Sequence, residues 1–248
     1  MTGQSDFEAG VFLVDKPEGA SSFYMVRQVR KALGMKKVGH AGTLDPFATG
    51  LLIICAGRPA TKMISEFMEG EKEYLATLRL GVETRTQDPE GEVTAESPVG
   101  TLSGSAIEEC LQQFRGELQQ VPPIYSALKH KGKPLYHYAR KGIEIQKPPR
   151  TVNIHTLERT DGDGEVSDDA PYLKIRVVCS KGTYIRTLGA DIGRALGCGA
   201  YLTALRRVRS GCFHVRDSID GRSLQEEDAR ERLLKKGISV TDVCNLLH

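Results

Sequence analysis

The sequence lacks the features that mark several large protein classes. Its longest apolar run is Leu51 to Ala56, far shorter than the roughly 20 residues that a membrane-spanning helix needs. The first residues contain neither a basic segment nor an apolar one, so no secretion signal is expected. The six cysteines form no C-x-x-C pair, which favours free thiols in a reducing compartment over disulfides or a zinc site. We therefore expect a cytoplasmic protein with no membrane partner.

Common cofactor motifs are also missing. The sequence contains no P-loop, no G-x-G-x-x-G and no cluster of histidines and cysteines at metal-ligand spacing. We therefore expect no cofactor and no metal. The 248 residues, of which 40% are hydrophobic, suffice for one large domain or two small ones. No repeat or linker divides them.

Acidic residues are absent between Glu18 and Asp45, and only Glu144 occurs between Lys129 and Arg150. The net charge of +2 therefore hides a segregation of charge, which is typical of a protein with one anion-facing side. Charge alone fits an ordinary solvated surface equally well. The basic residues form three groups: Arg27, Arg30, Lys31, Lys36 and Lys37; Lys129, Lys131, Lys133, Arg140, Lys141, Lys147 and Arg150; and Arg206, Arg207 and Arg209.

Apolar patterning predicts a mixture of strands and helices without a regular β-α-β order. This mixture favours an α+β fold with a mainly antiparallel sheet over a doubly wound parallel one. Strands are expected at 11–15, 51–55, 72–80, 151–157 and 173–179. Helices are expected from a cap at Ser21 or Ser22 to Gly34, at 59–68, after a capping box of Ser105 and Glu108, at 183–196, and from Ser223 to Lys236.

Asp45 lies in a glycine-rich loop that ends at Gly50. Pro46 keeps residue 45 out of the helical region and denies the loop a backbone donor. A carboxylate on such a loop, after a long basic stretch, suits a nucleophile directed at a polyanion. From local spacing alone, an ordinary Asp-Pro turn is the more frequent explanation.

The segment His40-Ala-Gly-Thr-Leu-Asp-Pro-Phe-Ala-Thr-Gly50 resembles the catalytic motif of the TruB family, the tRNA pseudouridine-55 synthases. The resemblance extends along nearly the whole chain, in the family's order. It implies the pseudouridine synthase fold, with a mixed, mainly antiparallel central sheet flanked by helices, in one catalytic domain over residues 1–248. The other matching segments are Val14–Ser22, Lys72–Gly81, Pro122–Lys129 with Tyr138–Gly142, Cys179–Leu188 and Leu202–Ser210.

The resemblance implies three catalytic residues. Asp45 is the nucleophile, by attack on the sugar or by assisting glycal formation. Arg186 pairs with it and keeps it ionised, although by itself Arg186 would be interpreted as a surface arginine on a helix. Tyr74 stacks on the target base and is a candidate for moving its proton, while a half-buried core tyrosine is the alternative.

The resemblance also implies residues that bind the flipped uridine. His40 takes the vacated position in the stack, although a lone loop histidine usually has no special role. Tyr184 and Leu205 line the base pocket, although periodicity alone would assign both to the core.

The basic, tyrosine-bearing segment 124–150 resembles the family's RNA-gripping insertion in its bacterial standalone type. A mobile charged loop is the alternative. Lys16 is expected in loop architecture or in a phosphate contact. The expected RNA-binding residues are Lys16, Lys129, Lys131, Lys133, Arg140 and Lys141.

The function implied is isomerisation of uridine 55 in the tRNA T-loop by a monomer that needs no guide RNA. Family members usually continue into a PUA-type RNA-binding domain, whereas 38 residues follow Ser210 here, which we expect to form a short extension over 211–248. Two other functions stay open: an RNA-binding or tRNA-folding module, and an RNA glycosidase.

Overall fold

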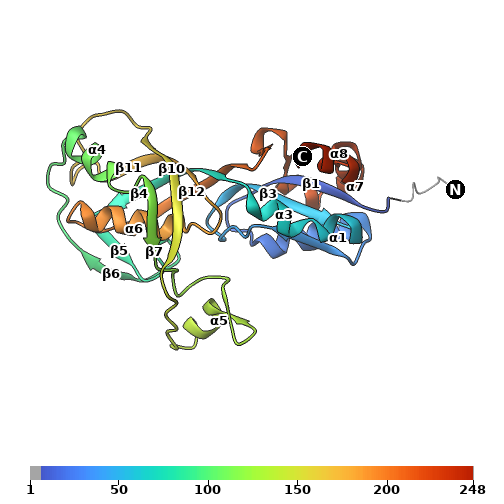
Figure 1. The fold of residues 1–248 in the computed structure, drawn as a ribbon, viewed down its shortest axis with the longest axis horizontal. Coiled ribbons are helices and arrows are strands. Elements are labelled where there is room, and N and C mark those ends of the chain that lie inside the picture. The colour runs from blue at the N-terminus through green and yellow to red at the C-terminus, as the bar shows by residue number, and fades with distance from the viewer. Residues whose placement is uncertain (1–6, 248) are drawn as a thin grey trace. The chain divides into compact units, whose positions relative to one another are not determined.

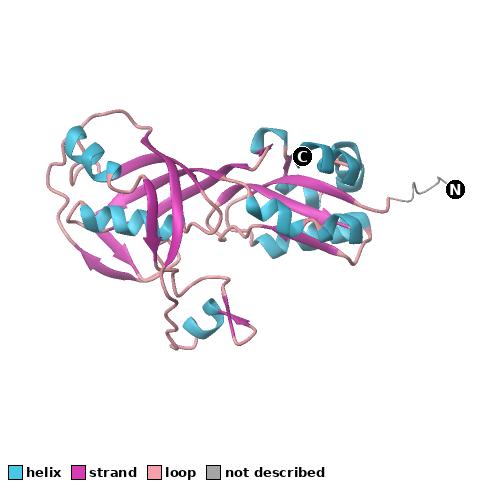
Figure 2. Cartoon of the chain, in the orientation of Figure 1, coloured by secondary structure: helices cyan, strands magenta, loops and turns pink. Residues whose placement is uncertain are grey.

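The computed structural model describes residues 7–247. Over this range the chain is a mixture of helices and strands (Figure 2), and it divides into two compact units. The first unit comprises Met1–Lys72 and Arg206–His248, and the second comprises Glu73–Leu205. No helix within residues 7–247 is both long and apolar enough to cross a lipid bilayer.

The first unit combines both ends of the described chain, coloured blue and red in Figure 1. Its sheet has the strand order β14-β1-β3-β12, with β2 paired to β3 and β13 paired to β12. Its elements are β1 (Gly10–Lys16), α1 (Ser22–Leu33), β2 (Val38–Ala41), β3 (Thr49–Ala56), α2 (Arg58–Lys62), α3 (Ile64–Glu69), the end of β12 (Ala200–Ser210), β13 (Phe213–His214), η1 (Val215–Asp217), β14 (Ile219–Asp220), η2 (Gly221–Gln225), α7 (Ala229–Lys236) and α8 (Val240–Leu247).

The central strands β1 and β3 are covered on both faces, which explains their unbroken apolar runs. Phe12 and Val14 pack with α1 in one core cluster. Val11 and Leu13 point to the other face and pack with Phe67 of α3 in a second cluster. This two-sided core fixes the framework from which the loop after β2 extends.

In the second unit β10 pairs antiparallel with both β11 and β7. The strand order of this unit is β12-β4-β11-β10-β7. Helix α6 packs closely on this sheet at Gly189, because a Cβ there would lie 2.9 Å from the Leu202 side chain. Its elements are β4 (Lys72–Leu80), β5 (Val82–Thr84), β6 (Val93–Glu96), α4 (Gly104–Gln112), β7 (Gly116–Gln120), β8 (Lys129–His130), β9 (Lys133–Pro134), α5 (Leu135–Ala139), β10 (Arg150–Arg159), β11 (Tyr172–Cys179), α6 (Ile185–Ala195) and the start of β12.

Between β7 and β10 the chain makes the long excursion that the sequence predicts. Figure 1 shows this segment, marked by α5, extending away from the strands of its unit. It contains a hairpin formed by the short strands β8 and β9. The two residues of its turn, Lys131 and Gly132, have φ of 46° and 81°. The excursion therefore has secondary structure of its own.

The predicted α+β class with a mixed, mainly antiparallel sheet is confirmed, while three details were wrong. Helix 59–68 is two helices, α2 and α3, separated at Met63. The cap of α4 is Ser103, whose Oγ accepts from the Ala106 amide, and not Ser105. The helix expected from Ser223 is a 3-10 turn followed by α7, which begins at Ala229. The expectation of a single domain stays a prediction.

Candidate active site

Asp45 lies on the loop that joins β2 to β3 in the first unit. The turn around it is closed by the Ala48 amide, which donates to the Asp45 carbonyl at 3.1 Å. The preceding residue is anchored by Ser22 of α1: the Leu44 amide donates to its Oγ at 2.9 Å, and the Oγ donates to the Leu44 carbonyl at 3.0 Å. Because Ser22 is buried, the backbone next to Asp45 is fixed to a helix terminus.

Lys16 holds the other side of Asp45. Its ammonium is fully buried and donates to the carbonyls of Pro17, Ala20 and Pro46 at 2.9, 2.6 and 3.1 Å. An ammonium has three protons, and all three are used by these carbonyls. Of the two roles expected for Lys16, the geometry supports loop architecture, and the phosphate contact stays a prediction.

Arg207 fixes both ends of the loop. Its guanidinium donates to the Gly42 carbonyl at 2.9 Å and to the Leu51 carbonyl at 2.7 Å. Gly50 has φ of 101°, and a Cβ there would lie 2.2 Å from the Arg207 carbonyl oxygen, so only glycine fits this approach. Arg207 is 2% exposed. The sequence placed it in a basic group directed at anions, and its structural role was missed.

His40 lies on β2, just before this loop, and interacts electrostatically with Arg207. Burial first, and the Arg207 guanidinium second, lower the pKa of His40 below its ordinary value of 6.5. Its Nε2 lies 3.3 Å from Oγ1 of Thr43. The ring is therefore neutral near pH 7, which suits the stacking role expected for it.

In the second unit Arg186 occupies the first turn of α6 and is not a surface arginine. Its guanidinium donates to the carbonyls of Thr86 and Tyr125 at 2.6 and 2.7 Å. It also forms an ion pair of 3.2 Å with Asp88, and both side chains are 4% exposed. The pairing of Arg186 with Asp45 stays a prediction, because Asp45 belongs to the other unit.

Asp88 was missed from the sequence because its surroundings are typical of a turn. Its carboxylate accepts from the Thr86 hydroxyl and from the Glu90 amide. Such local bonds are what an Asp provides in any Asx turn. The signal that could have found it is physical: a buried arginine needs a buried counter-charge.

Tyr184 caps α6, and its backbone is held by Gln120. The side-chain Nε2 of Gln120 donates to the Tyr184 carbonyl at 3.0 Å, and its Oε1 accepts from the Tyr184 backbone amide at 2.8 Å. The Arg150 guanidinium lies 4.6 Å from the centre of the Tyr184 ring. Gln120 was also missed, because one glutamine at the end of a strand carries no pattern.

The other expected pocket residues lie on two strands. Tyr74, near the start of β4, is half-buried, whereas Ala76, Leu78 and Leu80 on the same face are buried. Leu205 on β12 is buried. Both fit the pocket role and the core role that the sequence left open.

The expected RNA-binding side chains of the excursion are all exposed. None of them forms an ion pair within residues 7–247, and Arg140 lies over the ring of Tyr136 at 5.5 Å. A cationic surface without acidic partners is suited to phosphates. These side chains are Lys129, Lys131, Lys133, Arg140 and Lys141.

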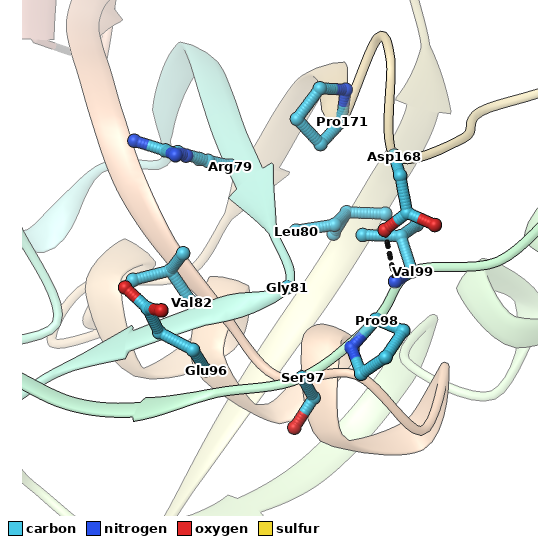
Figure 3. Close-up of a pocket in the computed structure, with 10 residues that line it drawn as sticks. All are labelled: Arg79, Leu80, Gly81, Val82, Glu96, Ser97, Pro98, Val99, Asp168 and Pro171. Carbon is cyan, nitrogen blue, oxygen red and sulfur yellow. Dashed lines mark hydrogen bonds between the residues drawn. The ribbon is translucent and has the colours of Figure 1, made fainter.

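The second unit also has a shallow hollow of about 360 Å³ (Figure 3). One wall is fixed by Asp168, which accepts from the Val99 amide at 2.7 Å. None of the expected site residues lines the hollow. Within residues 7–247, the structure has no group of three or more His, Cys, Asp or Glu side chains that could hold a metal ion.

Comparison with known proteins agrees with the motifs. The model of the TruB family pseudouridylate synthase N-terminal domain matches residues 30–185, and that of the tRNA pseudouridylate synthase B C-terminal domain matches residues 186–243. The tRNA pseudouridine synthase B of Desulfotalea psychrophila is 62% identical over 244 residues, which are 98% of this chain and 99% of that protein. Its namesake from Chromobacterium violaceum is 51% identical over 227 residues, 91% of this chain and 72% of that protein.

A solved structure supports the fold. A chain in the crystal structure of a Cbf5-Nop10-Gar1 complex has a TM-score of 0.69 and 28% identity, with coverage of 96% of this chain and 62% of that chain. Because the two family models take in residues 30–243 and the identity extends over nearly the whole chain, the chain belongs to the TruB family of pseudouridylate synthases.

Proposed function

We propose that this chain isomerises uridine 55 in the T-loop of tRNA to pseudouridine, with Asp45 as the nucleophile. It acts in the cytoplasm as a single chain, without guide RNA or cofactor. The names of its relatives support tRNA as the substrate. The identity of 62% to a protein named tRNA pseudouridine synthase B outweighs the 28% shared with a chain from a multi-protein complex.

The observation that carries the proposal is the support of the Asp45 loop. Ser22, Lys16 and Arg207 together hold six carbonyls and one amide of the loop and its flanks. An ordinary surface turn has no need for two buried cations bound to its backbone. A nucleophile does need such support, because a misplacement of about 1 Å can cost about 100-fold in rate.

The proposed reaction balances without a co-reactant. The bond from C1′ to N1 of the uridine breaks, the uracil turns, and a bond from C1′ to C5 forms. The C5 proton leaves and N1 gains a proton. Asp45 stabilises the electron-poor sugar, either as a covalent partner at C1′ or while a glycal forms. Tyr74 is the candidate for moving the C5 proton.

Arg186 is proposed to keep Asp45 ionised. A guanidinium remains charged in a buried environment, and Asp88 together with two carbonyls fixes its orientation. The neutral His40 ring is proposed to replace the flipped uridine in the stack, with Tyr184 and Leu205 against the base. The exposed cations of residues 124–150 are proposed to bind the T-arm backbone.

A T-arm transcript with tritium at C5 of its uridines separates this function from its rivals. The proposal predicts tritium release together with an equal amount of pseudouridine. Release of free uracil would indicate a glycosidase. Binding with no release and no pseudouridine would indicate an RNA-binding or RNA-folding module, and would overturn the enzymatic function.

A further inference from the structure

Helix α1 has one face with no protein partner among the described residues. Its inner face packs Met25, Val26, Val29 and Leu33 into the core of the first unit. Phe23, Arg27 and Lys31 lie at four-residue spacing, on one stripe of the helix, and all three are exposed. Lys36 and Lys37, also exposed, follow directly after the helix. We call Phe23, Arg27, Lys31, Lys36 and Lys37 the α1 basic face.

The positive charge of this face is uncompensated. None of its four cations forms an ion pair or a side-chain hydrogen bond within residues 7–247, and no acid occurs between Glu18 and Asp45. The arginines of the third basic group differ: Arg206 pairs with Asp15, Arg209 pairs with Glu71, and Arg207 is buried. Uncompensated cations at this density create a positive potential that attracts a polyanion.

Phe23 gives the same face an aromatic surface. It is 55% exposed, and the guanidinium carbons of Arg27 and Arg30 lie 5.9 and 5.6 Å from its ring centre. An exposed aromatic ring beside arginines is the composition with which proteins hold nucleotides by stacking while they neutralise phosphates. Arg30 is anchored through its bond to the Val38 carbonyl at 2.8 Å, which fixes this group in place.

The α1 basic face begins at the loop that carries Asp45. Ser22, the first residue of α1, is hydrogen-bonded to Leu44, and Phe23 follows it directly. From Ser22 to Lys31 the helix rises by about 14 Å, a length comparable with about four phosphate spacings of 3.4 Å, the value for one strand of a DNA duplex. An RNA whose uridine reaches Asp45 therefore has its flanking nucleotides within reach of this face.

We infer that the α1 basic face binds the RNA strand that flanks the target uridine. Arg27, Lys31, Lys36 and Lys37 contact its phosphates, and Phe23 packs against one nucleotide. This inference rests on the proposed function and adds a second RNA contact, separate from residues 124–150.

The test is a salt series of binding measurements on the full chain with a T-arm stem-loop RNA. The variant Arg27→Gln/Lys31→Gln removes one arginine and one lysine from the face. The matched control Arg79→Gln/Lys174→Gln removes one of each from exposed positions on β4 and β11. Circular dichroism and melting temperature verify that both variants fold.

We expect the Kd of Arg27→Gln/Lys31→Gln to rise about tenfold, and its slope of log Kd against log salt to fall by roughly 1.5, as for two lost phosphate contacts. Phe23→Leu removes a ring but no charge, so its Kd should rise about fivefold at an unchanged slope, whereas Phe23→Tyr should bind like wild type. The loss should fall mainly in KM. The control pair should behave as wild type.

A wild-type Kd and slope in Arg27→Gln/Lys31→Gln, or an equal shift in the control pair, would overturn the inference. Failure of the proposed function is a different result: the wild-type chain would form no pseudouridine in the same RNA. Each failure can therefore be recognised without the other.

Discussion

At the scale of single residues, the loop that carries Asp45 depends on a few long-range contacts. Arg207 donates to carbonyls at both ends of the loop, Gly42 and Leu51. Lys16 and Ser22 hold the backbone on either side of Asp45. In the proposed reaction, the contribution of these contacts is to position the carboxylate.

Replacement of Arg207 tests this positioning. Arg207→Lys keeps the charge but cannot bridge two carbonyls with a planar fork. We expect kcat to fall about 100-fold with little change in KM, and the free energy of unfolding to fall by about 1–3 kcal/mol for the carbonyl left without a donor. Steady-state kinetics and urea unfolding measure both.

The neighbouring Arg206→Lys is the control. Arg206 pairs with both carboxylate oxygens of Asp15, at 3.0 and 2.6 Å, in a partly exposed position, so Arg206→Lys also loses a two-pronged contact, but one that lies outside the loop. Its kinetics should stay within about twofold of wild type. A normal kcat in Arg207→Lys would show that the loop does not depend on the two carbonyl hydrogen bonds of Arg207.

His40 makes stability depend on pH. The folded chain holds its pKa below 6.5, whereas the unfolded chain titrates at the ordinary value. As pH falls through 6.5, the unfolded state therefore takes up the proton first. The stability that His40 contributes is complete above 6.5 and is lost as pH falls through the lower, folded-state pKa.

Denaturant unfolding between pH 7 and pH 5 tests this direction, because His40→Asn removes the titration. We expect the free energy of unfolding to decline less steeply in His40→Asn than in wild type over this range. Equal slopes would show that His40 has the same proton affinity in both states.

At the scale of elements, two adjacent serines at the start of α1 have different tasks. Ser21 caps the helix by accepting from the Tyr24 amide at 3.0 Å, whereas Ser22 binds Leu44 in the loop. Ser21→Ala should cost about 1 kcal/mol of stability and leave kcat near normal. Ser22→Ala should cost a similar amount and lower kcat by at least about tenfold.

Comparison of kcat between the two variants, at a temperature where both are folded, separates stability from positioning. We expect kcat to fall in Ser22→Ala alone. If both variants lost activity in parallel, the effect would be one of helix stability and not of the loop.

Local pattern was sufficient to predict five of the longer strands, β1, β3, β4, β10 and β11, but not β12. The strand expected at 72–80 coincides with β4, because alternate residues face the core. Helix α1 ends at Gly34, whose φ of 66° is the left-handed cap that glycine favours. The break between α2 and α3 could not be predicted, because neither glycine nor proline marks Met63.

The incorrect prediction of Ser105 as the cap of α4 has a physical cause. Ser105 and Glu108 have the spacing of a capping box, but Glu108 instead pairs with Arg115 at 2.7 Å. Ser103 then accepts the helix amide. Two serines compete for the same amides here, and sequence spacing does not decide between them.

The candidate site could be predicted only in part, for a similar reason. The motifs and the resemblance single out Asp45, Tyr74 and Arg186 directly. Asp88, Gln120 and Arg207 act through contacts with residues distant in sequence, and each has a local pattern that looks ordinary. Tertiary contacts between polar residues leave no periodic pattern in the amino-acid sequence.

At the scale of the whole molecule, the three basic groups have two kinds of role. The groups on α1 and in residues 124–150 are largely exposed, whereas the group at 206–209 is engaged in internal ion pairs and carbonyl bonds. A formal net charge of +2 conceals this difference. The segregation of charge suits a polyanion partner, and burial shows which cations can reach it.

In the proposed function, RNA binding is joined to chemistry at one carboxylate, that of Asp45. Asp45→Asn preserves the shape of the side chain but removes its charge and its nucleophilicity. The remaining contacts of the chain with RNA should be unaffected, so binding and turnover should separate. The T-arm RNA with tritium at C5 allows both to be followed in the same sample.

The decisive measurement is single-turnover tritium release by Asp45→Asn at a concentration that saturates the RNA. We expect release and pseudouridine formation to fall by at least about 10,000-fold, while Kd for the RNA stays within about threefold of wild type. Turnover at more than about a tenth of the wild-type rate would contradict the assignment of Asp45 as the nucleophile.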